Sequence, residues 1–479
     1  MAIILPANTL AASGFSVDNS CRFNGDAYLH KTVGTPTNAD KYTLSVWIKR
    51  SILTSFGPDN AQYIMSYDGG GNPREHIRFN DSTDTLNWYF RDSGGTATNL
   101  TTTQEFRDVS AWYHFVFVYD SGQAVAANRQ TIYCNGAEIT SFSSSGYVAQ
   151  DTDSNLNSNV SVKIGAIGTG SPSVYSSQYL SEVVFLDGQT LAASNFGEYD
   201  EDSPTIWKPK DVSTLTFGDN GFYLDFEDSA NLGNDANGGT DWTEVGLAAT
   251  DQATDTPTNN FCTMSPIASL DSPVMSEGNC YMTNDGGSEH AVSTFAASSG
   301  RWYFEVKVTV QNSANALVAG ISDVYMSQKE LAEGWLGMDT GQYGYVGYDG
   351  KIYHADDGGT AYGDVITTND ILGVYVDLED NKLYFAKNGT VQNSGTGHTI
   401  TAAASTTGGA YQFVTGDWFT TTSNVDYGVN FGGCPAFAIS SGNTDDNGYG
   451  NFEYSPNITG DGSAKSFYAL NSANLAEFG

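Results

Sequence analysis

The chain has 479 residues, of which 39% are hydrophobic and 13% aromatic, so it is long enough to bury more than one sizeable core. It carries 55 acidic and 20 basic residues, a formal net charge of −35. A surface with this charge repels phosphate backbones and anionic lipid, so we expect neither nucleic-acid binding nor membrane insertion. The start, MAIILPANTLAASGF, lacks the basic region of a signal peptide, and the sequence contains no apolar run of about 18 residues.

Residues 1–195 predict short β-strands throughout. KYTLSVWIKR (41–50) alternates apolar and polar side chains, as a half-buried strand does. WYHFVFVYD (112–120) is apolar on both faces, which suits a central strand. Asn135 and Gly136 supply the two positive-φ positions of a tight hairpin.

The composition and the hydrophobic pattern change over residues 196–285. This stretch opens with the acidic, proline-bracketed FGEYDEDSPTIWKPK (196–210) and contains one short strand, FYLDF (222–226). From 228 to about 266 it is poor in large apolar residues, so we predict an irregular connector lying over domain surfaces.

Strand patterns return over residues 286–479, for example in RWYFEVKVTV (301–310) and ALVAGISD (316–323). MSQKELAEGW (326–335) is the one segment here with a helical pattern. The five cysteines of the chain are scattered, without a CxxC pair, which argues against a disulfide framework or a zinc site. Cys262 and Cys280 are the only two close enough in sequence to be suspected of a bridge.

One pattern occurs twice. LGVYVDLEDNKLYFAKNG (372–389) and FVFVYDSGQAVAANRQTIYCNG (115–136) both run strand, Asp, polar bend, strand, Asn-Gly. The acidic bend DLEDNK is either part of an active site or the bend of a β-hairpin. We favour the hairpin, because Asp, Asn and Lys are common in turns for conformational reasons alone.

Two parts of the sequence contain motifs in the same order as known protein families. The first 190 or so residues resemble the laminin G-like, concanavalin A-like family, through SCRFNGDAYLHKT, YTLSVWIKR, WYHFVFVYD, IYCNG, VKIGAIG and YLSEVVFLDGQTLAASNFGE. Residues 286–479 resemble a SPRY domain, through GRWYFEVKV, ALVAGISD, GYVGYDGKIYHADDG, DILGVYVDLEDNKLYFAKNG and VNFGG followed by PAF. These resemblances imply an all-β fold of two antiparallel jelly-roll β-sandwiches, residues 1–195 and 286–479, joined by the irregular connector 196–285.

The connector adds a resemblance of its own. IWKPKDVSTLTFGDNGFYLDFEDS and the ending FYALNSANLAEFG are similar to segments of structural proteins of tailed phages, marine ones especially. This resemblance implies a virion protein such as a tail fibre, a spike or a capsid appendage, exposed on the particle surface after assembly in the host cytoplasm.

Catalytic signatures are weak. The paired carboxylates are Asp225 with Glu227, Asp377 with Glu379, and Asp356 with Asp357. We interpret them as solvated strand-end or turn residues, since the E-x-D-x-x-E arrangement expected of concanavalin-like glucanases is absent. GGSEH (286–290) contains Ser288 and His290 but is not a G-x-S-x-G elbow, and His114 sits in an apolar strand, which favours a structural histidine.

Calcium is the one metal that the laminin G-like resemblance implies, through scattered loop oxygens, and no cofactor is required. DTDSN (151–155) begins like an oxygen-ligand loop, so Asp151 and Asp153 are weak candidates, but its Gly and closing Glu are missing. NTDDNG (443–448) has Tyr454 where a bidentate Glu is needed.

The best candidate for a binding surface is an aromatic group. Tyrosine offers an apolar face to a sugar ring or a partner side chain and a hydroxyl to hydrogen-bond. In SPRY domains, loops near this region line the ligand-binding face. The alternative is that tyrosines at alternate positions of a strand simply pack in the core. The candidates are Trp335, Tyr343, Tyr345, Tyr348 and Tyr353.

We therefore predict a non-enzymatic virion protein that binds a host-surface glycan or a neighbouring virion protein through loops, as a homo-oligomer or in many copies. One alternative is a carbohydrate-active hydrolase or depolymerase. Another is a purely architectural capsid decoration protein.

Overall fold

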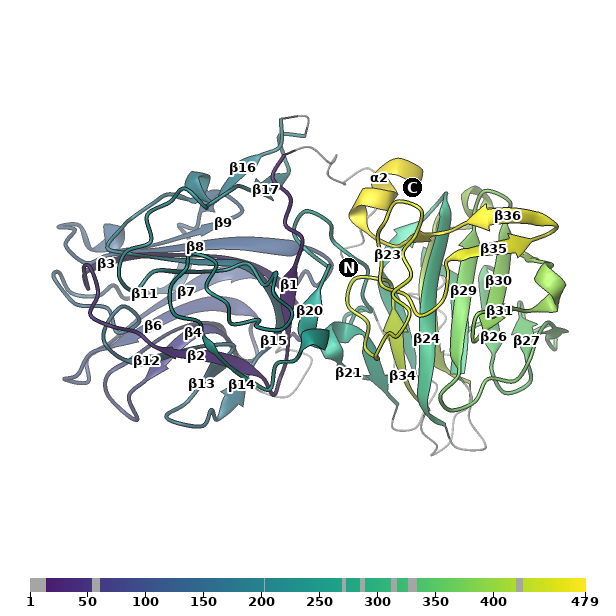
Figure 1. Ribbon diagram of the computed structural model, residues 1–479, viewed down its shortest axis with the longest axis horizontal. Helices are drawn as coiled ribbons and strands as arrows, with labels where there is room; N and C mark the ends of the chain where they lie inside the picture. Colours follow the sequence, from purple (N-terminus) through teal and green to yellow (C-terminus); the bar gives the residue numbers. More distant parts are fainter. Residues whose placement is uncertain are drawn as a thin grey trace. The chain divides into compact units, whose positions relative to one another are not determined.

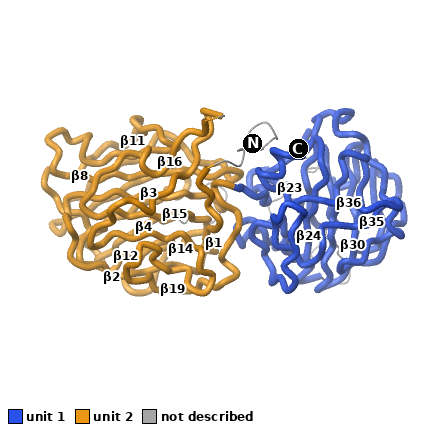
Figure 2. Tube along the Cα trace, turned by 45° about the horizontal axis from the view of Figure 1, so that its top comes forward, with its two compact units in different colours: residues 1–11, 259–479 blue, residues 12–258 orange. Residues whose placement is uncertain are grey.

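The computed structural model describes residues 14–53, 61–201, 203–268, 273–284, 289–311, 317–325, 334–418 and 425–479. Within these residues the chain forms two compact units (Figure 2). Unit 2 comprises residues 12–258, and the described part of unit 1 begins at residue 259. Each unit is a sandwich of two sheets, so the predicted all-β fold is confirmed (Figure 1).

Unit 2 consists of two antiparallel sheets, which we call sheets A and B. Sheet A has the order β10 (Ala137–Glu138), β9 (Gln130–Cys134), β8 (Trp112–Asp120), β3 (Lys41–Arg50), β15 (Ser177–Asp187), β1 (Ser20–Asn24) and β20 (Gln252–Ala253), with β18 (Phe222–Leu224) also paired to β15. Sheet B has the order β11 (Phe142–Ser145), β7 (Ala97–Glu105), β6 (Thr85–Arg91), β5 (Arg74–Phe79), β4 (Gln62–Asp68), β12 (Ser161–Ile164), β2 (Tyr28–Thr32) and β19 (Thr243–Val245). Two hairpins complete it: β13 (Ala166–Ile167) with β14 (Val174–Tyr175), and β16 (Gly197–Tyr199) with β17 (Trp207–Pro209).

The core of unit 2 lies between these sheets, because each strand turns alternate side chains inward. In β3 the inward residues are Tyr42, Leu44, Val46 and Ile48, as the alternation in the sequence predicts. They share one hydrophobic cluster with residues of sheet B such as Trp88, which is fully buried.

Much of the predicted connector contributes strands. Residues 197–258 lie within unit 2, where β18 pairs with β15, β19 with β2, and β20 with β1. Phe222 and Trp242 from this stretch join the unit 2 core, with ring centroids 4.7 Å apart.

Unit 1 also consists of two sheets, which we call sheets C and D. Sheet C has the order β21 (Val274–Ser276), β22 (Tyr281–Thr283), β34 (Val425–Asn430), β24 (Arg301–Gln311), β29 (Ile371–Asp377), β30 (Lys382–Lys387) and β31 (Thr390–Val391), with β32 (His398–Thr399) paired to β30 and β37 (Tyr468–Ala469) parallel to β24. Sheet D has the order β23 (His290–Ala297), β33 (Tyr411–Asp417), β25 (Leu317–Asp323), β26 (Gln342–Val346), β27 (Lys351–Tyr353) and β28 (Thr360–Ala361).

Helical structure is short. The described residues include α2 (Ser472–Phe478). Its N-cap residue is Asn471, whose side chain accepts a hydrogen bond from the Asn474 amide. The 3₁₀ turns are Ala126–Asn128, Ala193–Asn195, Ala249–Asp251, Glu277–Asn279, Asn393–Gly395 and Ala403–Ser405. The helical pattern predicted at 326–335 lies, except for its last two residues, outside the described residues. No helix among the described residues is both long enough and apolar enough to cross a membrane.

The repeated pattern forms the same structure in both units. β8, β9 and β10 are joined by a polar bend and by Asn135-Gly136, whose φ angles are 48° and 82°. β29, β30 and β31 are joined in the same way, with Asp377 opposite Lys382 and then Asn388-Gly389 at φ 47° and 77°. The predicted hairpins are therefore confirmed.

A C-terminal segment of unit 1 covers the outer face of sheet C. The hairpin β35 (Asn457–Gly460) with β36 (Ser463–Ser466), drawn in yellow in Figure 1, belongs to it. Its side chains pack on three tyrosines that lie side by side on β24, β29 and β30, and the resulting cluster contains Tyr303, Tyr375, Tyr384, Phe452, Ile458 and Phe467.

The suspected disulfide bridge is absent. None of the five cysteines, all of which are among the described residues, forms a disulfide, and Cys262 and Cys280 are both buried. They act here as small apolar residues.

Candidate functional site

Three aromatic side chains form a compact cluster on the outer side of sheet D, and we call it the aromatic patch: Trp335, Tyr353 and Trp418. The ring centroids are 4.1 Å apart for Trp335 and Trp418, 4.5 Å for Tyr353 and Trp418, and 5.6 Å for Trp335 and Tyr353. All three side chains are half-buried. Two of the three ring pairs pack edge to face, and the third, Tyr353 with Trp418, is tilted at 41°, so the rings hold one another in place and present a rigid apolar surface.

Trp335 is held in the patch because the segment that contains it packs closely on sheet D. Tyr353 ends β27 and Trp418 directly follows β33, both on the face opposite the unit 1 core. Trp335 lies in the segment before β26, and its neighbour Leu336 is fully buried. That segment approaches the sheet closely at Gly344, where a Cβ atom would lie 2.6 Å from the Leu336 carbonyl oxygen. Glycine is required at this point for the close approach.

The structure separates the five predicted aromatic residues. Trp335 and Tyr353 lie in the patch, and Tyr348 is 53% exposed in the turn between β26 and β27. Tyr343 and Tyr345 point the other way, into the unit 1 core, and are 2% and 0% exposed. Their rings therefore offer no face to a ligand.

Trp418 was not identified from the sequence. The strand YQFVTGD (411–417) turns Tyr411 and Phe413 into the core, so its alternation continues to the end of the strand. An aromatic residue directly after such a strand is a weak signal by itself, and its link to Trp335 exists only in three dimensions.

The polar edge of the patch lies at Tyr353. Its hydroxyl donates a hydrogen bond of 2.8 Å to the Asp349 carboxylate, which also pairs with Lys351 at 3.4 Å. Burial, together with Asp349, raises the pKa of Tyr353 to about 12, so the phenol stays protonated at neutral pH. The patch thus combines an apolar centre with charged groups at its rim, a common composition for a protein-binding surface.

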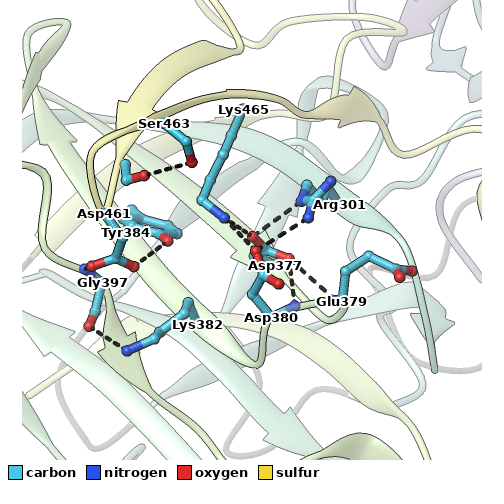
Figure 3. Close-up of polar contacts among 11 residues, drawn as sticks. Arg301, Asp377, Glu379, Asp380, Lys382, Tyr384, Gly397, Asp461, Ser463 and Lys465 are labelled. Atoms are coloured by element: carbon cyan, nitrogen blue, oxygen red, sulfur yellow. Dashed lines mark hydrogen bonds and ion pairs between the residues drawn. The ribbon is translucent and has the colours of Figure 1, made fainter.

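The acidic bend after β29 is held by cations (Figure 3). Asp377 is fully buried, and its Oδ2 lies 3.0 Å from both Arg301 Nε and Lys465 Nζ, which reach it from opposite sides. Its Oδ1 accepts hydrogen bonds from the Glu379 and Asp380 amides. Asp380 also pairs with Arg301 and Lys465, and Lys465 first, then Arg301, lower its pKa.

This network fastens the C-terminal segment to the hairpin. Lys465 belongs to β36, and nearby Tyr384 donates a hydrogen bond of 2.7 Å to Asp461, between β35 and β36. Glu379 accepts from the Gly300 amide. Every carboxylate of the bend is engaged in holding structure, so the pair Asp377 and Glu379 is not arranged as a general acid and base.

A second predicted carboxylate pair lies beside a third carboxyl. Glu182, at a bulge of β15 with φ 49°, accepts a hydrogen bond of 2.7 Å from the Tyr223 hydroxyl. Burial, and to a smaller degree Asp225 and Glu227, raise the pKa of Glu182 to about 8. Burial also raises the pKa of Asp225 and Glu227. Sequence reasoning missed Glu182, because it lies over 40 positions from its partners.

The third pair forms a turn. Asp356 has a φ of 52° and Asp357 accepts a hydrogen bond from the Gly359 amide, so both serve the loop between β27 and β28. Their prediction as turn residues agrees with this geometry.

His114 is buried between Ser45 and Trp207. The Trp207 indole donates to His114 Nδ1 at 2.9 Å, and His114 Nε2 lies 2.8 Å from Ser45 Oγ. Because an indole can only donate, Nδ1 must accept and Nε2 carries the proton. His114 therefore donates to Ser45 and cannot act as its base. Burial lowers the pKa of His114 to about 3, which keeps it neutral.

His290 accepts a hydrogen bond from the Leu336 amide at 3.2 Å and is fully buried, while Ser288 lies outside the described residues. The geometry of His290 is that of a structural histidine.

The calcium candidates lie at loops of unit 2. Asp151 has a φ of 55°. Asp153 hydrogen-bonds to Asp40, whose pKa is raised by burial and then by Asp153. Across the described residues, no group of three or more His, Cys, Asp or Glu side chains is arranged to hold a metal ion. The residues present therefore do not fit a preformed metal centre.

Asp445 lies in the second loop considered for calcium, and its carboxylate accepts hydrogen bonds from the protein itself. Its carboxylate accepts hydrogen bonds from the amides of Asn447, Tyr449 and Ala469 and from the Asn474 side chain. These donors occupy both oxygens and fix the C-terminal segment.

Two family models match separate parts of the chain. One, described as the concanavalin A-like lectin/glucanases superfamily, matches residues 23–173, and the other, described as the SPRY domain, matches residues 301–415. The chain carries a laminin G-like domain followed by a SPRY domain. The two resemblances drawn from the motifs are thereby confirmed at the level of domains.

Among similar proteins, Ran-binding protein 9 of Xenopus tropicalis is 32% identical over 113 residues, 24% of this chain and 20% of the relative. Ran-binding protein 10 of Danio rerio is 33% identical over 105 residues, 22% of this chain and 17% of the relative. The chain thus spans about a fifth of the length of these curated relatives.

Solved structures are similar at lower identity. The SPRY domain of human HERC1 is 15% identical, with a TM-score of 0.28, over 36% of this chain and 99% of that domain. A heptameric SAP-like pentraxin from Limulus polyphemus is 18% identical, with a TM-score of 0.27, over 37% of this chain and 80% of the pentraxin.

Proposed function

We propose that this chain is a non-enzymatic binding protein whose SPRY domain recognises a partner polypeptide through the aromatic patch. The observation that carries the proposal is the packing of Trp335, Tyr353 and Trp418 into one rigid, half-buried surface on the outer side of sheet D. Tryptophan and tyrosine are the residues that most often dominate the energy of protein interfaces. From the Ran-binding proteins we carry over only the class of ligand, a polypeptide, and not Ran itself.

The setting that we propose is a virus particle, with the protein as a surface-exposed tail fibre, spike or capsid appendage. Its partner would be another virion protein, and many copies or a homo-oligomer would supply avidity. This setting rests on the resemblance to phage structural proteins that the motifs of the connector and of the C-terminal sequence imply. Mass spectrometry of purified particles from the source organism should detect the chain, and its absence would refute the setting but not the binding site.

The binding site is tested with Trp418→Ala and Tyr353→Ala in the full chain. Cross-linking in the particle identifies the bound partner, and its affinity for the purified variants is then measured. We expect each substitution to weaken binding by about tenfold or more, as for a central interface residue. Val365→Ala, an exposed apolar residue of unit 1, is the matched control and should leave affinity unchanged. Equal affinity for all variants would exclude the patch.

The non-enzymatic part of the proposal is supported by the geometry of the acidic bend and of His114 described above. The alternative, a hydrolase or depolymerase, predicts release of reducing sugar from host polysaccharide. Release that Glu182→Gln abolishes would establish this alternative. We further propose that binding requires no cofactor, and chelation of calcium should leave partner affinity and the melting temperature unchanged.

A further inference from the structure

The part of unit 1 that supplies two of the three rings of the aromatic patch is strongly acidic. Residues 334–365 contain five aspartates and one lysine. Four of these aspartates belong to the turns that flank Trp335 and Tyr353, and they are Asp339, Asp349, Asp356 and Asp357. The first two residues are half-buried and the last two are exposed.

Backbone contacts place two of the aspartates beside Trp335. The Asp356 amide donates a hydrogen bond of 3.2 Å to the Gly337 carbonyl, so the loop between β27 and β28 lies against the segment that carries Trp335. Asp339 lies in that same segment, two residues beyond Gly337. Between them is Met338, which is 41% exposed and whose amide donates to the Trp335 carbonyl. This side of the patch therefore combines an adaptable apolar side chain with carboxylates.

The other two aspartates lie beside Tyr353. After burial, first Asp349 and then Asp357 contribute to the raised pKa of Tyr353, so the charges of both reach its hydroxyl. Asp357 Oδ1 accepts a hydrogen bond of 2.9 Å from the Gly359 amide. Gly359 in turn lies against the ring, because a Cβ atom there would be 2.6 Å from Tyr353 Cζ. The loop thus holds its carboxylates at the edge of the patch.

A cation of the chain itself already occupies part of this arrangement. Lys351 Nζ lies 3.4 Å from Asp349 Oδ2 and 5.9 Å from the centroid of the Tyr353 ring. The negative face of an aromatic ring attracts a cation within about 6 Å of its centroid. Ring and carboxylate therefore act together on one positive charge at the rim of the patch.

The other three carboxylates lack such a partner. Within the described part of the chain, no basic side chain lies within 4.0 Å of Asp339, Asp356 or Asp357. Like charges that are not compensated repel one another, and an oppositely charged partner offsets that repulsion when it binds. Charge complementarity therefore favours a basic ligand at this patch and disfavours an acidic one.

We propose that the aromatic patch recognises an arginine side chain of the partner polypeptide. The guanidinium group lies over the rings and pairs with the carboxylates at the rim, and its aliphatic stem packs on Met338. Arginine suits this surface better than lysine, because its planar group stacks on aromatic rings and donates two parallel hydrogen bonds to one carboxylate. The inference rests on the proposed function, since it names the chemistry of the partner at the same patch.

A library of random short peptides displayed on yeast tests the preference. The library is selected on the full chain and, in parallel, on the double variant Tyr353→Ala/Trp418→Ala, which has the same net charge and so removes peptides that bind any acidic surface. Peptides that bind only the unmodified chain should be enriched in arginine relative to the unselected library. Enrichment of acidic or of uncharged apolar peptides would overturn the inference but keep the proposed function. If no peptide distinguishes the two proteins, both fail.

Charge variants of the chain then locate the recognition. Asp349→Asn and the double variant Asp356→Asn/Asp357→Asn keep the size of the side chains, and asparagine tolerates the φ of 52° at position 356. Each should weaken binding of a selected arginine peptide about fivefold, and the difference should shrink as salt is raised. Asp446→Asn is the matched control, because Asp446 is exposed in the C-terminal segment, and should leave affinity unchanged. Unchanged affinity in both rim variants, or an equal loss in the control, would refute recognition of arginine.

Discussion

The outer faces of sheet B and sheet C differ in whether their buried cations are paired with carboxylates. On sheet C, Arg301 and Lys465 are paired with Asp377 and Asp380, and the C-terminal segment covers the face. On sheet B, Lys163 is about as buried as Lys465 but has no carboxylate partner among the described residues.

The difference distinguishes charged side chains that hold segments of this molecule together from charged side chains that do not. A paired, covered network such as that of Asp377 fixes one segment on another. Lys163 has no carboxylate in contact among the described residues, although the chain has a net charge of −35, so its charge does not fasten one described segment to another.

The largest expected effect is that of Asp377→Ala. The substitution leaves Lys465 and Arg301 with the exposed Asp380 in place of their buried partner and removes the acceptor for two amides of the bend. We expect unit 1 to lose about 3–5 kcal/mol of unfolding free energy, measured by urea denaturation. Asp380→Ala is the control, because its side chain is 52% exposed, and should cost less than about 1 kcal/mol. Similar costs for both would mean that the network is not structural.

Phe467→Ala tests whether the C-terminal segment is a fixed part of unit 1. Phe467 is fully buried and packs on Tyr375 and Tyr384, at centroid distances of 5.1 Å and 6.2 Å. We expect a loss of about 3 kcal/mol in urea denaturation, and about 1 kcal/mol for the more conservative Phe467→Leu. An unchanged midpoint for Phe467→Ala would show that the face of sheet C is open in solution.

A pH-dependent effect is expected at Glu182. Its folded-state pKa, about 8, lies above the ordinary value of 4.5, so its stabilising contribution is complete below about pH 4.5 and is lost as the pH rises towards 8. Between about pH 5 and pH 7, wild-type unit 2 should lose about 2 kcal/mol relative to Glu182→Gln. Denaturation midpoints of both proteins across this range give the comparison. Parallel pH profiles would contradict the raised pKa.

The smallest effect is expected for the stability of Arg91→Gln. Arg91 has a backbone carbonyl as its hydrogen-bond partner and faces the like charge of Arg74. The melting temperature should therefore correspond to a change within about 0.5 kcal/mol, in either direction. Arg50→Gln, at a buried arginine paired with Asp84, should be far more destabilising. If Arg91→Gln costs as much, the cations of sheet B are structural and the contrast with sheet C fails.

The sequence predicted the fold well because the alternation of side chains is a local property. The hairpins around 115–136 and 372–389 follow from apolar alternation and from Asn-Gly turns. The short strands at 222–224 and 252–253 could not be assigned to a sheet in advance, because only the neighbours β15 and β1 give them partners.

The candidate sites were harder to predict, because they depend on which face of a strand a residue occupies. Tyr345 and Tyr353 have similar sequence surroundings, yet one packs in the core and the other in the aromatic patch. Trp418 joins Trp335 from 83 positions away, and Lys163 is isolated from carboxylates only in the folded chain. No local pattern carries such information.

The C-terminal segment also determines where unit 1 can be cut. The SPRY match ends at residue 415, but Glu305 on β24 is fully buried and accepts hydrogen bonds from the amides of Glu453 and Tyr454. A fragment truncated near the family boundary would expose the Glu305 carboxylate without these two backbone donors, beside a row of uncovered tyrosines. Such a fragment is expected to aggregate during expression, whereas one extending through α2 keeps its own cover.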